Sequence, residues 1–326
     1  MKDYEKLLNI FSDHLQKYRQ KINLQHPIEL YEPENYILSL GGKRIRPLFC
    51  LIACDLFDKD PALALDAALS VELFHNFSLI HDDILDKAPL RRGKPTVHEK
   101  WNTGRGILSG DVMLVKSFDC LSEYEPLLHH KLHRLFVKTA VEVCEGQQLD
   151  INFENRKAVT VSEYIDMITF KTAVLLACSL NMGALIAGAS NEDAAHLYQA
   201  GKQLGIAFQI MDDLLDAFPG EEFGKQPGGD IIANKKTILL LSAFELSNKT
   251  QSEKLIALLA LPDERNGDKL KGVMDLYHEL NLNESVRKKA DEYTAAAISH
   301  LSLVKASEYK KKQFEHLAIN LLNRQF

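Results

Sequence analysis

The chain has 326 residues, of which 46% are hydrophobic and 26% charged, and its formal net charge at pH 7 is −6. This composition is ordinary for a folded globular protein and excludes a disordered or fibrous chain. A net negative charge supplies no basic field for nucleic acid, so we expect no nucleic-acid partner. No low-complexity linker and no fixed-period repeat divides the chain, which predicts one domain over residues 1–326.

The N-terminal segment carries charges throughout and lacks the apolar stretch of a signal peptide, so we expect a cytoplasmic protein. The most apolar long segment, residues 170–190, contains Lys171, Asn181 and small residues, which favours a buried helix over a membrane span. The cysteines are odd in number and lack CxxC spacing, which predicts reduced core residues. They are Cys50, Cys54, Cys120, Cys144 and Cys178.

Apolar residues recur at helical spacing almost everywhere, whereas alternating β-branched runs are rare, so the sequence predicts an all-α fold. We expect helices at residues 4–22, 47–58, 61–86, 104–124, 127–153, 162–188, 191–218, 236–247, 251–260, 268–280, 284–305 and 308–323. Pro47 at a helix start, a capping box of Thr160 and Glu163, and Asn191 as an N-cap support three starts. The lysines at 310–312 are expected on a solvated helix face.

Three polar connections that contain glycine interrupt the helical pattern and are the expected places for functional loops. They are SLGGKRIRP (39–47), KAPLRRGKPTVHEKWNTG (87–104) and PGEEFGKQPGGDIIANKK (219–236). The second connection directly follows the first of two acidic clusters, and the third follows the other.

The first acidic cluster lies in HDDILD, residues 81–86. At about 100° per residue, Asp82, Asp83 and Asp86 share a single arc of a helix, with Asp82 and Asp86 about 40° apart. Three like charges this close repel one another unless a cation lies among them. Carboxylate oxygens suit Mg²⁺, which also keeps waters and accepts phosphate oxygens. A solvated acidic patch is the alternative reading of a single cluster.

The second cluster repeats this spacing at Asp212, Asp213 and Asp216 on another apolar helix, which favours metal sites over accidental patches. If the two helices face each other across a cavity, they would hold several Mg²⁺ ions between them. Cations on the three connections indicate that the bound group is a phosphate or diphosphate. These cations are Lys43, Arg44, Arg46, Arg91, Arg92, Lys225, Lys235 and Lys236. No P-loop or strand-coupled GxGxxG motif indicates a nucleotide.

Together these segments closely resemble the short-chain trans-isoprenyl diphosphate synthases of the polyprenyl synthetase family, over most of the chain and in the family's order. The matching segments are GGKRIRP (41–47), His75, LIHDDILD (79–86), RRGKPT (91–96), GQQLD (146–150), FKTA (170–173), FQIMDDLLD (208–216), GKQPGGDI (224–231) and NKKT (234–237). The resemblance implies the isoprenoid synthase fold, with antiparallel helices around a central cavity. It also implies a homodimer that condenses isopentenyl diphosphate with an allylic diphosphate.

The resemblance further implies roles for individual residues. The expected Mg²⁺ ligands, for about three ions that Mn²⁺ could replace, are Asp82, Asp86 and Asp212, with Asp83, Asp213 and Asp216 close by or in the outer shell. The allylic diphosphate would be held by Arg91, Lys171, Lys225 and Lys235, and isopentenyl diphosphate by Lys43, Arg46, His75 and Arg92. The catalytic centre would be lined by Lys171, Thr172 and Gln209. The connection 219–236 and Arg324 are expected to close the site.

Product length depends in this family on the residues just before the first cluster, here Phe77 and Ser78. They lie about 6–8 Å down the helix from the metals. By helix angle Ser78 lies near the Asp82 face, whereas Phe77 is displaced by about 140°, which favours Ser78 as the lining residue. The resemblance implies that both residues act. One aromatic with one small residue implies geranylgeranyl diphosphate, with farnesyl diphosphate next, and plain core packing of Phe77 is the alternative.

Other functions stay open for this sequence. A longer-chain polyprenyl diphosphate synthase would use the same motifs. A class I terpene cyclase shares the fold and the first cluster, but it needs no second pocket for a diphosphate. The pair His81 and Asp82 also fits a metal-dependent phosphohydrolase, which needs further histidine ligands. A regulatory subunit without activity usually has degraded aspartate clusters, and both clusters are intact here.

Overall fold

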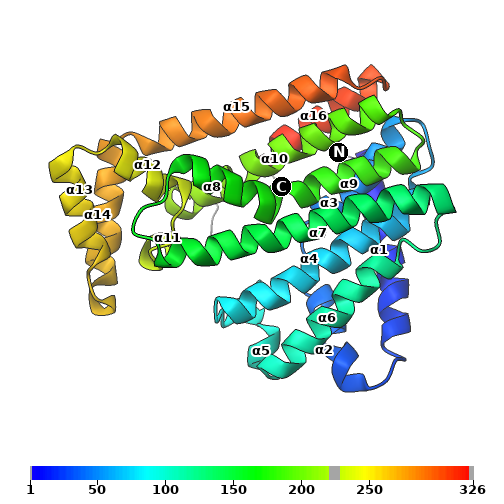
Figure 1. Cartoon of the computed structure of the whole chain (residues 1–326), viewed down its shortest axis with the longest axis horizontal. Coiled ribbons are helices and arrows are strands. Elements are labelled where there is room, and N and C mark those ends of the chain that lie inside the picture. Colours follow the sequence, from blue (N-terminus) through cyan, green and yellow to red (C-terminus); the bar gives the residue numbers. More distant parts are fainter. Residues whose placement is uncertain (1, 220–227, 323–326) are drawn as a thin grey trace. The chain divides into compact units, whose positions relative to one another are not determined.

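The computed structural model describes residues 2–219 and 228–322, and Figure 1 shows that helices account for nearly all of this part of the chain. The predicted all-α class is confirmed. The strands in the described residues are two short ones, β1 (Leu90–Arg91) and β2 (Lys94–Pro95), which pair antiparallel inside the second connection.

The helices follow the predicted pattern closely. Their bounds are α1 Lys2–Ile22, α2 Ile28–Ser39, α3 Ile45–Leu56, α4 Leu65–Leu85, α5 Val97–Lys100, α6 Thr103–Asp119, α7 Pro126–Asn155, α8 Val161–Ile168, α9 Val174–Ile186, α10 Asn191–Ala217, α11 Gly229–Ile232, α12 Ile238–Leu246, α13 Lys249–Leu259, α14 Asn266–Glu279, α15 Leu282–Leu303 and α16 Glu308–Leu322. Two 3₁₀ turns, Pro61–Ala64 and Asp263–Arg265, and a π-helix, Thr169–Ala173, complete them.

Helix α2 is absent from the predicted pattern because Pro33 lies in its interior, where proline removes a backbone hydrogen bond. Tertiary contacts outweigh that local cost. The fully buried carboxylate of Glu34 accepts hydrogen bonds from the Tyr18 hydroxyl of α1 and, at 3.2 Å, from Lys116 Nζ of α6. One buried acid thus ties three helices together.

The three predicted helix starts have different outcomes. The capping box of Thr160 and Glu163 is confirmed at the start of α8. The prediction that Asn191 caps α10 is wrong, because Ser190 Oγ accepts the hydrogen bond from the Asp193 amide at 3.0 Å. Ser190 Oγ also donates to the Asp193 carboxylate at 2.7 Å, so the cap residue and the acid of the first turn are bonded to each other. Pro47 is the third residue of α3, which begins two residues earlier.

The lysines near the C-terminus were predicted to be solvated, and this is correct for Lys312 alone. Lys311 is 6% exposed and donates from Nζ to the Val304 carbonyl at 3.0 Å. Lys310 pairs with Asp55 at 3.0 Å and Asp58 at 2.8 Å, so the acids at the end of α3 draw it inward. These pairs anchor the start of α16.

The five cysteines are all free thiols, and three of them, Cys50, Cys54 and Cys178, lie in the core as predicted. Cys120 is partly exposed. The prediction is wrong for Cys144, which is exposed on α7. Apolar neighbours in sequence do not determine which face of a long helix a residue occupies.

Contacts between Cα atoms divide the chain into two compact units, each described by itself below. Unit 1 comprises Met1–Lys138, Cys178–Tyr198 and Val304–Lys311, and unit 2 comprises Thr139–Ala177, Gln199–Leu303 and Lys312–Phe326. The first acidic cluster belongs to unit 1 and the second to unit 2. A single domain over the whole chain stays a prediction.

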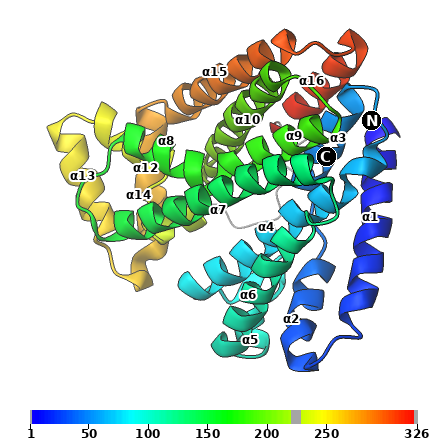
Figure 2. The ribbon, with the colours of Figure 1, turned by 45° about the vertical axis from the view of Figure 1, so that its right-hand side comes forward.

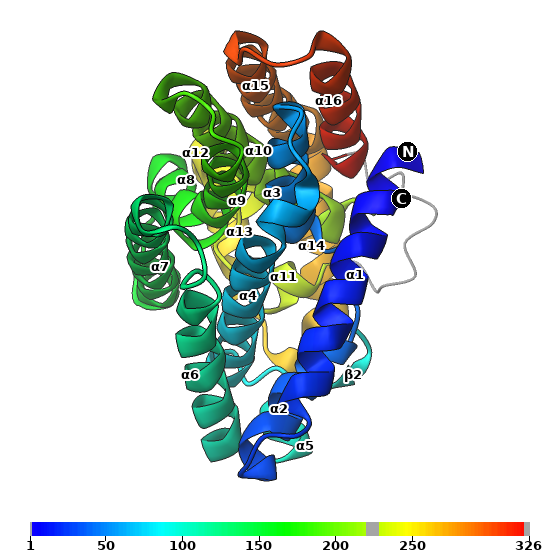
Figure 3. The same cartoon turned by 90° about the vertical axis from the view of Figure 1, so that its right-hand side faces the viewer.

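Unit 1 is built around α4, which packs along α6 (Figure 2), while α1 and α2 run beside each other (Figure 3). Two glycines of α6 let the acidic end of α4 approach. A Cβ on Gly110 would stand 2.3 Å from His81 Nε2, and a Cβ on Gly106 would stand 2.8 Å from the Ile84 Cδ1. Any larger residue at Gly110 would therefore push against the residue that precedes Asp82.

Unit 2 contains an equally close crossing, of α10 with the π-helix and the start of α9. A Cβ on Gly205 would stand 2.5 Å from Ala173 Cα, and one on Gly201 would stand 2.8 Å from Ala177 Cα. The crossing sets α10, which carries the second acidic cluster, directly against the segment that carries Lys171 and Thr172.

Two helical stretches, Pro61–Leu85 and Val161–Ile186, are long and apolar enough to cross a membrane. In the structure 67% of the first apolar window and 72% of the second are buried inside the protein. Core helices of soluble proteins have the same property. The absence of a membrane span stays a prediction.

The Glu34 site generates a prediction about stability. Replacing Lys116 by methionine leaves a buried carboxylate without its cation, which should lower the free energy of unfolding by about 3 kcal/mol. Burial already raises the pKa of Glu34, and Lys116 opposes that rise. Because the folded-state pKa lies above the unfolded one, ionisation disfavours the folded state, so stability falls as pH rises through the interval between them.

Urea denaturation at pH 5 and pH 8 measures both effects. We expect Lys116→Met to lose more stability at pH 8 than at pH 5. The matched control is Lys305→Met, because Lys305 and its partner Glu192 are both largely exposed and their pair contributes little. Equal losses in the two variants would contradict the assignment of Glu34.

Candidate active site

The first acidic cluster lies at the C-terminal end of α4, and its three carboxylates differ in exposure. Asp82 is partly exposed, Asp86 is exposed beyond the last residue of the helix, and Asp83 is 2% exposed. The backbone amide of Asp86 donates to the Asp82 carbonyl at 2.8 Å, which keeps these two residues on adjoining turns. The cluster therefore presents its first and third carboxylates and buries its second.

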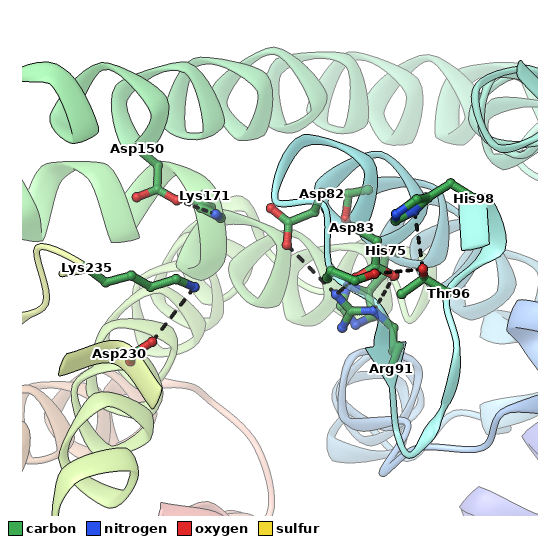
Figure 4. Close-up of polar contacts among 12 residues, drawn as sticks. His75, Asp82, Asp83, Arg91, Thr96, His98, Asp150, Lys171, Asp230 and Lys235 are labelled. Atoms are coloured by element: carbon green, nitrogen blue, oxygen red, sulfur yellow. Dashed lines mark hydrogen bonds and ion pairs between the residues drawn. The ribbon is translucent and has the colours of Figure 1, made fainter. Parts of the chain in front are cut away.

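Asp83 is buried because Arg91 of the β1–β2 hairpin grips it with two parallel hydrogen bonds (Figure 4). Arg91 Nε lies 2.8 Å from Asp83 Oδ2, and Arg91 Nη2 lies 2.7 Å from Asp83 Oδ1. The same Nη2 lies 3.9 Å from Asp82 Oδ2. Burial lowers the pKa of Arg91, but the Asp83 hydrogen bonds and charge more than offset this and raise it. The pair fixes the hairpin to the cluster.

A second set of basic side chains in unit 1, here called the arginine–histidine group, consists of Arg44, Arg46, His75 and Arg92. Arg44 pairs with the buried Glu72, and Arg46 Nη1 lies 3.1 Å from His75 Nε2. Burial lowers the pKa of Arg46 to about 10. Burial, followed by the charges of Arg46 and Arg92, lowers the pKa of His75. Arg46 Nε is buried without a hydrogen-bond partner, so an anion placed there would meet an unsatisfied donor.

Arg92 reaches this group because the neighbouring chain has no side chain in its way. Its Nη1 donates to the Gly41 carbonyl, and a Cβ on Gly42 would stand 2.8 Å from Arg92 Nη2. Helix α3 begins just after these glycines, with no side-chain cap on its first amides. The Arg92 guanidinium therefore lies against the Gly41–Gly42 turn that precedes α3.

The second acidic cluster, on α10, repeats the pattern of burial. Asp212 is exposed, Asp216 is partly exposed and Asp213 is 6% exposed. Asp216 Oδ2 accepts from the Asp230 amide at 3.0 Å, and the Asp216 carbonyl accepts from the Gly228 amide at 2.7 Å. These bonds fix the start of α11 against the cluster.

Asp213 is the most enclosed acid of this cluster. It accepts hydrogen bonds from the Tyr164 hydroxyl, from Gln209 Nε2 at 3.0 Å and from the Ile238 amide at 3.2 Å. Burial raises the pKa of Asp213 to about 6, against the opposite effect of these donors. Its carboxylate joins α8, α10 and the start of α12.

Lys171 and Thr172 lie on the π-helix, a distortion that is frequent at functional sites. Gly146 of α7 permits it, since a Cβ there would stand 2.2 Å from the Lys171 amide nitrogen. Lys171 Nζ lies 2.5 Å from Asp150 Oδ2 (Figure 4), and Thr172 Oγ1 donates to Gln209 Oε1 at 3.2 Å. The segments GQQLD and FKTA, far apart in sequence, therefore meet.

The remaining predicted residues fall as follows. Lys235 Nζ lies 3.8 Å from Asp230 Oδ1, and Lys43 is exposed beside Gly42. Phe77 is 8% exposed and meets Phe74 and His81 edge-on, at 5.3 Å and 4.9 Å between ring centres. Ser78 is half-buried and donates to the His75 carbonyl at 2.8 Å. Lys225 and Arg324 lie outside the described residues.

Three residues of these networks had no predicted role: Glu72, Asp150 and Tyr164. Asp150 ends the GQQLD segment, which gave it a signal by resemblance. Glu72 lies one turn before Asn76, and Asn76 Nδ2 donates a hydrogen bond to the Glu72 carboxylate at 2.8 Å. In the sequence, however, a lone glutamate on an apolar helix does not indicate which residue it pairs with. Tyr164 has no local signal, because its role depends on a residue 49 positions away.

In the described part of the chain, no three or more His, Cys, Asp or Glu side chains already form a cage for a metal. Mg²⁺ in proteins typically keeps several waters and binds one or two carboxylates together with phosphate oxygens. Asp82 is partly exposed, and Asp86 and Asp212 are exposed, so these three carboxylates lie at the protein surface. The buried Asp83 and Asp213 are each occupied by other donors.

Comparisons with known proteins agree with this geometry. The family model described as polyprenyl synthetase matches residues 27–277. A geranylgeranyl diphosphate synthase of Methanosarcina mazei is 46% identical over 222 residues, 67% of this chain and 68% of the relative. That of Sulfolobus acidocaldarius is 37% identical over 299 residues, 89% of both chains. A crystal structure of a geranylgeranyl pyrophosphate synthase superposes with a TM-score of 0.93 at 40% identity, over 99% of both chains.

The Gly42 contact generates a prediction about anion binding. Gly42→Ala places a methyl group against the Arg92 guanidinium, which must leave the arginine–histidine group, so diphosphate affinity should fall about tenfold. Gly41→Ala is the matched control, because Gly41 also has positive φ but a Cβ there meets nothing within 4 Å. Calorimetric titration with diphosphate measures both. An equal loss in the two variants would assign the effect to backbone strain and contradict the Arg92 contact.

Proposed function

Because this chain belongs to the polyprenyl synthetase family, we propose that it joins isopentenyl diphosphate head-to-tail to an allylic diphosphate and releases diphosphate, with geranylgeranyl diphosphate (C20) as product and farnesyl diphosphate (C15) as the next candidate. The observation that carries the proposal is the arginine–histidine group of unit 1, with the unsatisfied Arg46 Nε, beside a metal-type acidic cluster. A reaction of two diphosphates needs a second anion site of this kind.

Members of the family generally depend on divalent metals. Asp82, Asp86 and Asp212 would hold Mg²⁺, about three ions with Mn²⁺ as a substitute. Metal held by these carboxylates would supply positive charge beside the diphosphate oxygens, where negative charge grows when the C–O bond breaks. Asp216 would join from the outer shell, and Asp83 and Asp213 would orient the protein around the ions.

Side chains of the protein itself would bind the allylic diphosphate and stabilise the charge that develops on it. Arg91, Lys171, Lys225 and Lys235 hold the allylic diphosphate, and Lys171 leaves Asp150 to do so. As the C–O bond breaks, its electron pair stays with the diphosphate, whose growing charge these fixed cations stabilise. Exclusion of water protects the resulting allylic cation. The released diphosphate is the base for the final proton, so no dedicated protein base is required.

The second substrate would occupy the arginine–histidine group. Lys43, Arg46, His75 and Arg92 bind the diphosphate of isopentenyl diphosphate and hold its double bond in position to attack. The lowered pKa of His75 keeps its imidazole neutral, so the ring adds a hydrogen bond without a further charge. Closure by the connection 219–236 and Arg324 belongs to the same proposal.

Three competing functions make different demands. A class I cyclase or a phosphohydrolase releases diphosphate from one substrate and does not need Arg46 and Arg92. A regulatory subunit would not need both exposed and buried aspartates in each cluster. Diphosphate release that requires isopentenyl diphosphate supports the synthase, whereas release from the allylic substrate alone supports a cyclase or hydrolase, and no release supports a binding role.

We also propose a homodimer in the cytoplasm. Helices α6 and α7 each expose large apolar residues in unit 1, Leu108 and Val115 on the first and Leu127 and Val137 on the second. Apolar helix faces of this kind are typical of subunit interfaces. A solution mass of one chain would contradict the dimer. The free thiols, including the exposed Cys144, fit a reducing compartment.

The metal assignment predicts a large loss of activity. Asp82→Ala and Asp212→Ala should each lower turnover by about a thousandfold or more, because each removes a principal carboxylate ligand. Circular dichroism should change little, since Asp212 is exposed and Asp82 is not fully buried. Asp268→Ala, which removes an exposed carboxylate paired with Arg265 outside both clusters, is the control and should stay active. Near-normal turnover of either cluster variant would contradict the mechanism.

Product length supplies a separate prediction. Phe77→Ala removes the ring that meets Phe74 and His81, and the product should lengthen by about one prenyl unit, because Phe74 lies one helical turn, about 5 Å, further along. The conservative variant Phe77→Leu should change the distribution less. Chromatography of products from radiolabelled isopentenyl diphosphate measures this. An unchanged distribution in Phe77→Ala would make Phe77 a packing residue only.

A further inference from the structure

The carboxylate of Asp213 determines which way the Gln209 side chain faces. Tyr164, Gln209 and Ile238 all donate to Asp213, so the carboxylate accepts from three directions. Gln209 Nε2 lies 3.0 Å from Asp213 Oδ1. A flipped amide would set its carbonyl oxygen against a carboxylate oxygen, and neither can donate. The amide nitrogen therefore faces Asp213 and the amide oxygen faces away from it.

That amide oxygen in turn determines the direction of the Thr172 hydroxyl. Gln209 Oε1 accepts the Thr172 proton at 3.2 Å. A hydroxyl has one proton and two lone pairs, so a proton given to Gln209 leaves Thr172 with only lone pairs for any other neighbour. Thr172 is half-buried, and it follows Lys171 on the π-helix. Its oxygen is thus a fixed negative end of a dipole beside a diphosphate-binding lysine.

Tyr164 holds the far end of this chain of bonds. It is 2% exposed on α8, and its hydroxyl donates to the same Asp213 oxygen that accepts from the Ile238 amide. Without the hydroxyl, Asp213 Oδ2 keeps only the longer bond of 3.2 Å from Ile238. The buried carboxylate would then rotate toward other donors and release the Gln209 amide from its single orientation.

We propose that Tyr164 is a positioning residue for the ionisation step: through Asp213 and Gln209 it keeps the Thr172 oxygen with its lone pairs toward the developing allylic cation. This rests on the proposed synthase function. In that step the C–O bond of the allylic diphosphate breaks, the electron pair leaves with the diphosphate, and positive charge appears on the allylic carbon. No proton moves, so only the direction of the dipole matters.

The test is Tyr164→Phe in the full chain with Mg²⁺, and the expected signature is selective. The turnover number should fall about tenfold, the contribution of one well-placed hydrogen bond, while the KM for each diphosphate stays within about twofold. An ammonium analogue of the allylic cation, bound together with diphosphate, should lose about tenfold in affinity. A thio-diphosphate analogue of the allylic substrate, whose prenyl chain carries no positive charge, should keep its affinity.

Tyr124→Phe is the matched control. Tyr124 is another tyrosine with a bonded hydroxyl, which donates to the Leu63 carbonyl at 2.9 Å and accepts from the Ala67 amide at 3.2 Å, but it belongs to none of the site networks. We expect it to alter stability without altering the ratio of the two analogue affinities. Thr172→Val should show the same selective loss as Tyr164→Phe, and the double variant should be no worse than Thr172→Val alone.

Equal losses for the ammonium analogue and the thio-diphosphate analogue, or additive effects in the double variant, would overturn the role of Tyr164. If Tyr164→Phe does not fold, Gln209→Met removes the same amide nearer to Thr172 and must show the selective loss. If the wild-type protein does not elongate the allylic substrate at all, the proposed function is refuted instead. An active wild type with an unaltered Tyr164→Phe would refute only the inference.

Discussion

The cost of burying a carboxylate governs both acidic clusters. Asp83 is 2% exposed and Asp213 is 6% exposed, and each accepts hydrogen bonds from at least one other element of the same unit. Arg91 supplies a bidentate pair to the first, and Tyr164, Gln209 and Ile238 supply neutral donors to the second. Because an unpaired buried charge would be very unfavourable, these contacts fix where the neighbouring carboxylates must lie.

The two buried carboxylates have different kinds of partner, and this has different consequences for the two clusters. At the first cluster the partner is a cation, so Arg91 is held in the hairpin beside both Asp83 and Asp82. At the second cluster the partners are dipoles, and the negative charge of Asp213 orients them in turn. The same DDxxD spacing therefore anchors the β1–β2 hairpin in unit 1 and a network of polar side chains in unit 2.

Close backbone approaches support both arrangements. Gly42 makes room for Arg92, and Gly146 makes room for the π-helix that carries Lys171 and Thr172. Neither glycine has a side chain that contributes chemistry. Each is required because a neighbouring functional residue occupies the place of its Cβ, which links the motifs GGKRIRP and GQQLD to function through packing.

Much of this was predictable from sequence, since helical periodicity gave the all-α class and the DDxxD spacing identified the two clusters. Helix angles placed each trio on one arc, but they could not show which carboxylate turns inward, because that depends on Arg91 and Tyr164. Local rules failed where a distant contact decides the outcome. Examples are α2, which tolerates Pro33 because Glu34 ties it to α1 and α6, and Lys311, which is buried.

The different roles assigned to the exposed and the buried aspartates of each cluster can be tested directly. Crystals containing Mn²⁺ and diphosphate would locate the metals by anomalous scattering. We expect metals about 2.0–2.2 Å from carboxylate oxygens of Asp82, Asp86 and Asp212, with Asp83 still paired to Arg91 and Asp213 still bonded to Tyr164. Metals bound directly by Asp83 or Asp213, with those pairs broken, would contradict the division between exposed ligands and buried anchors.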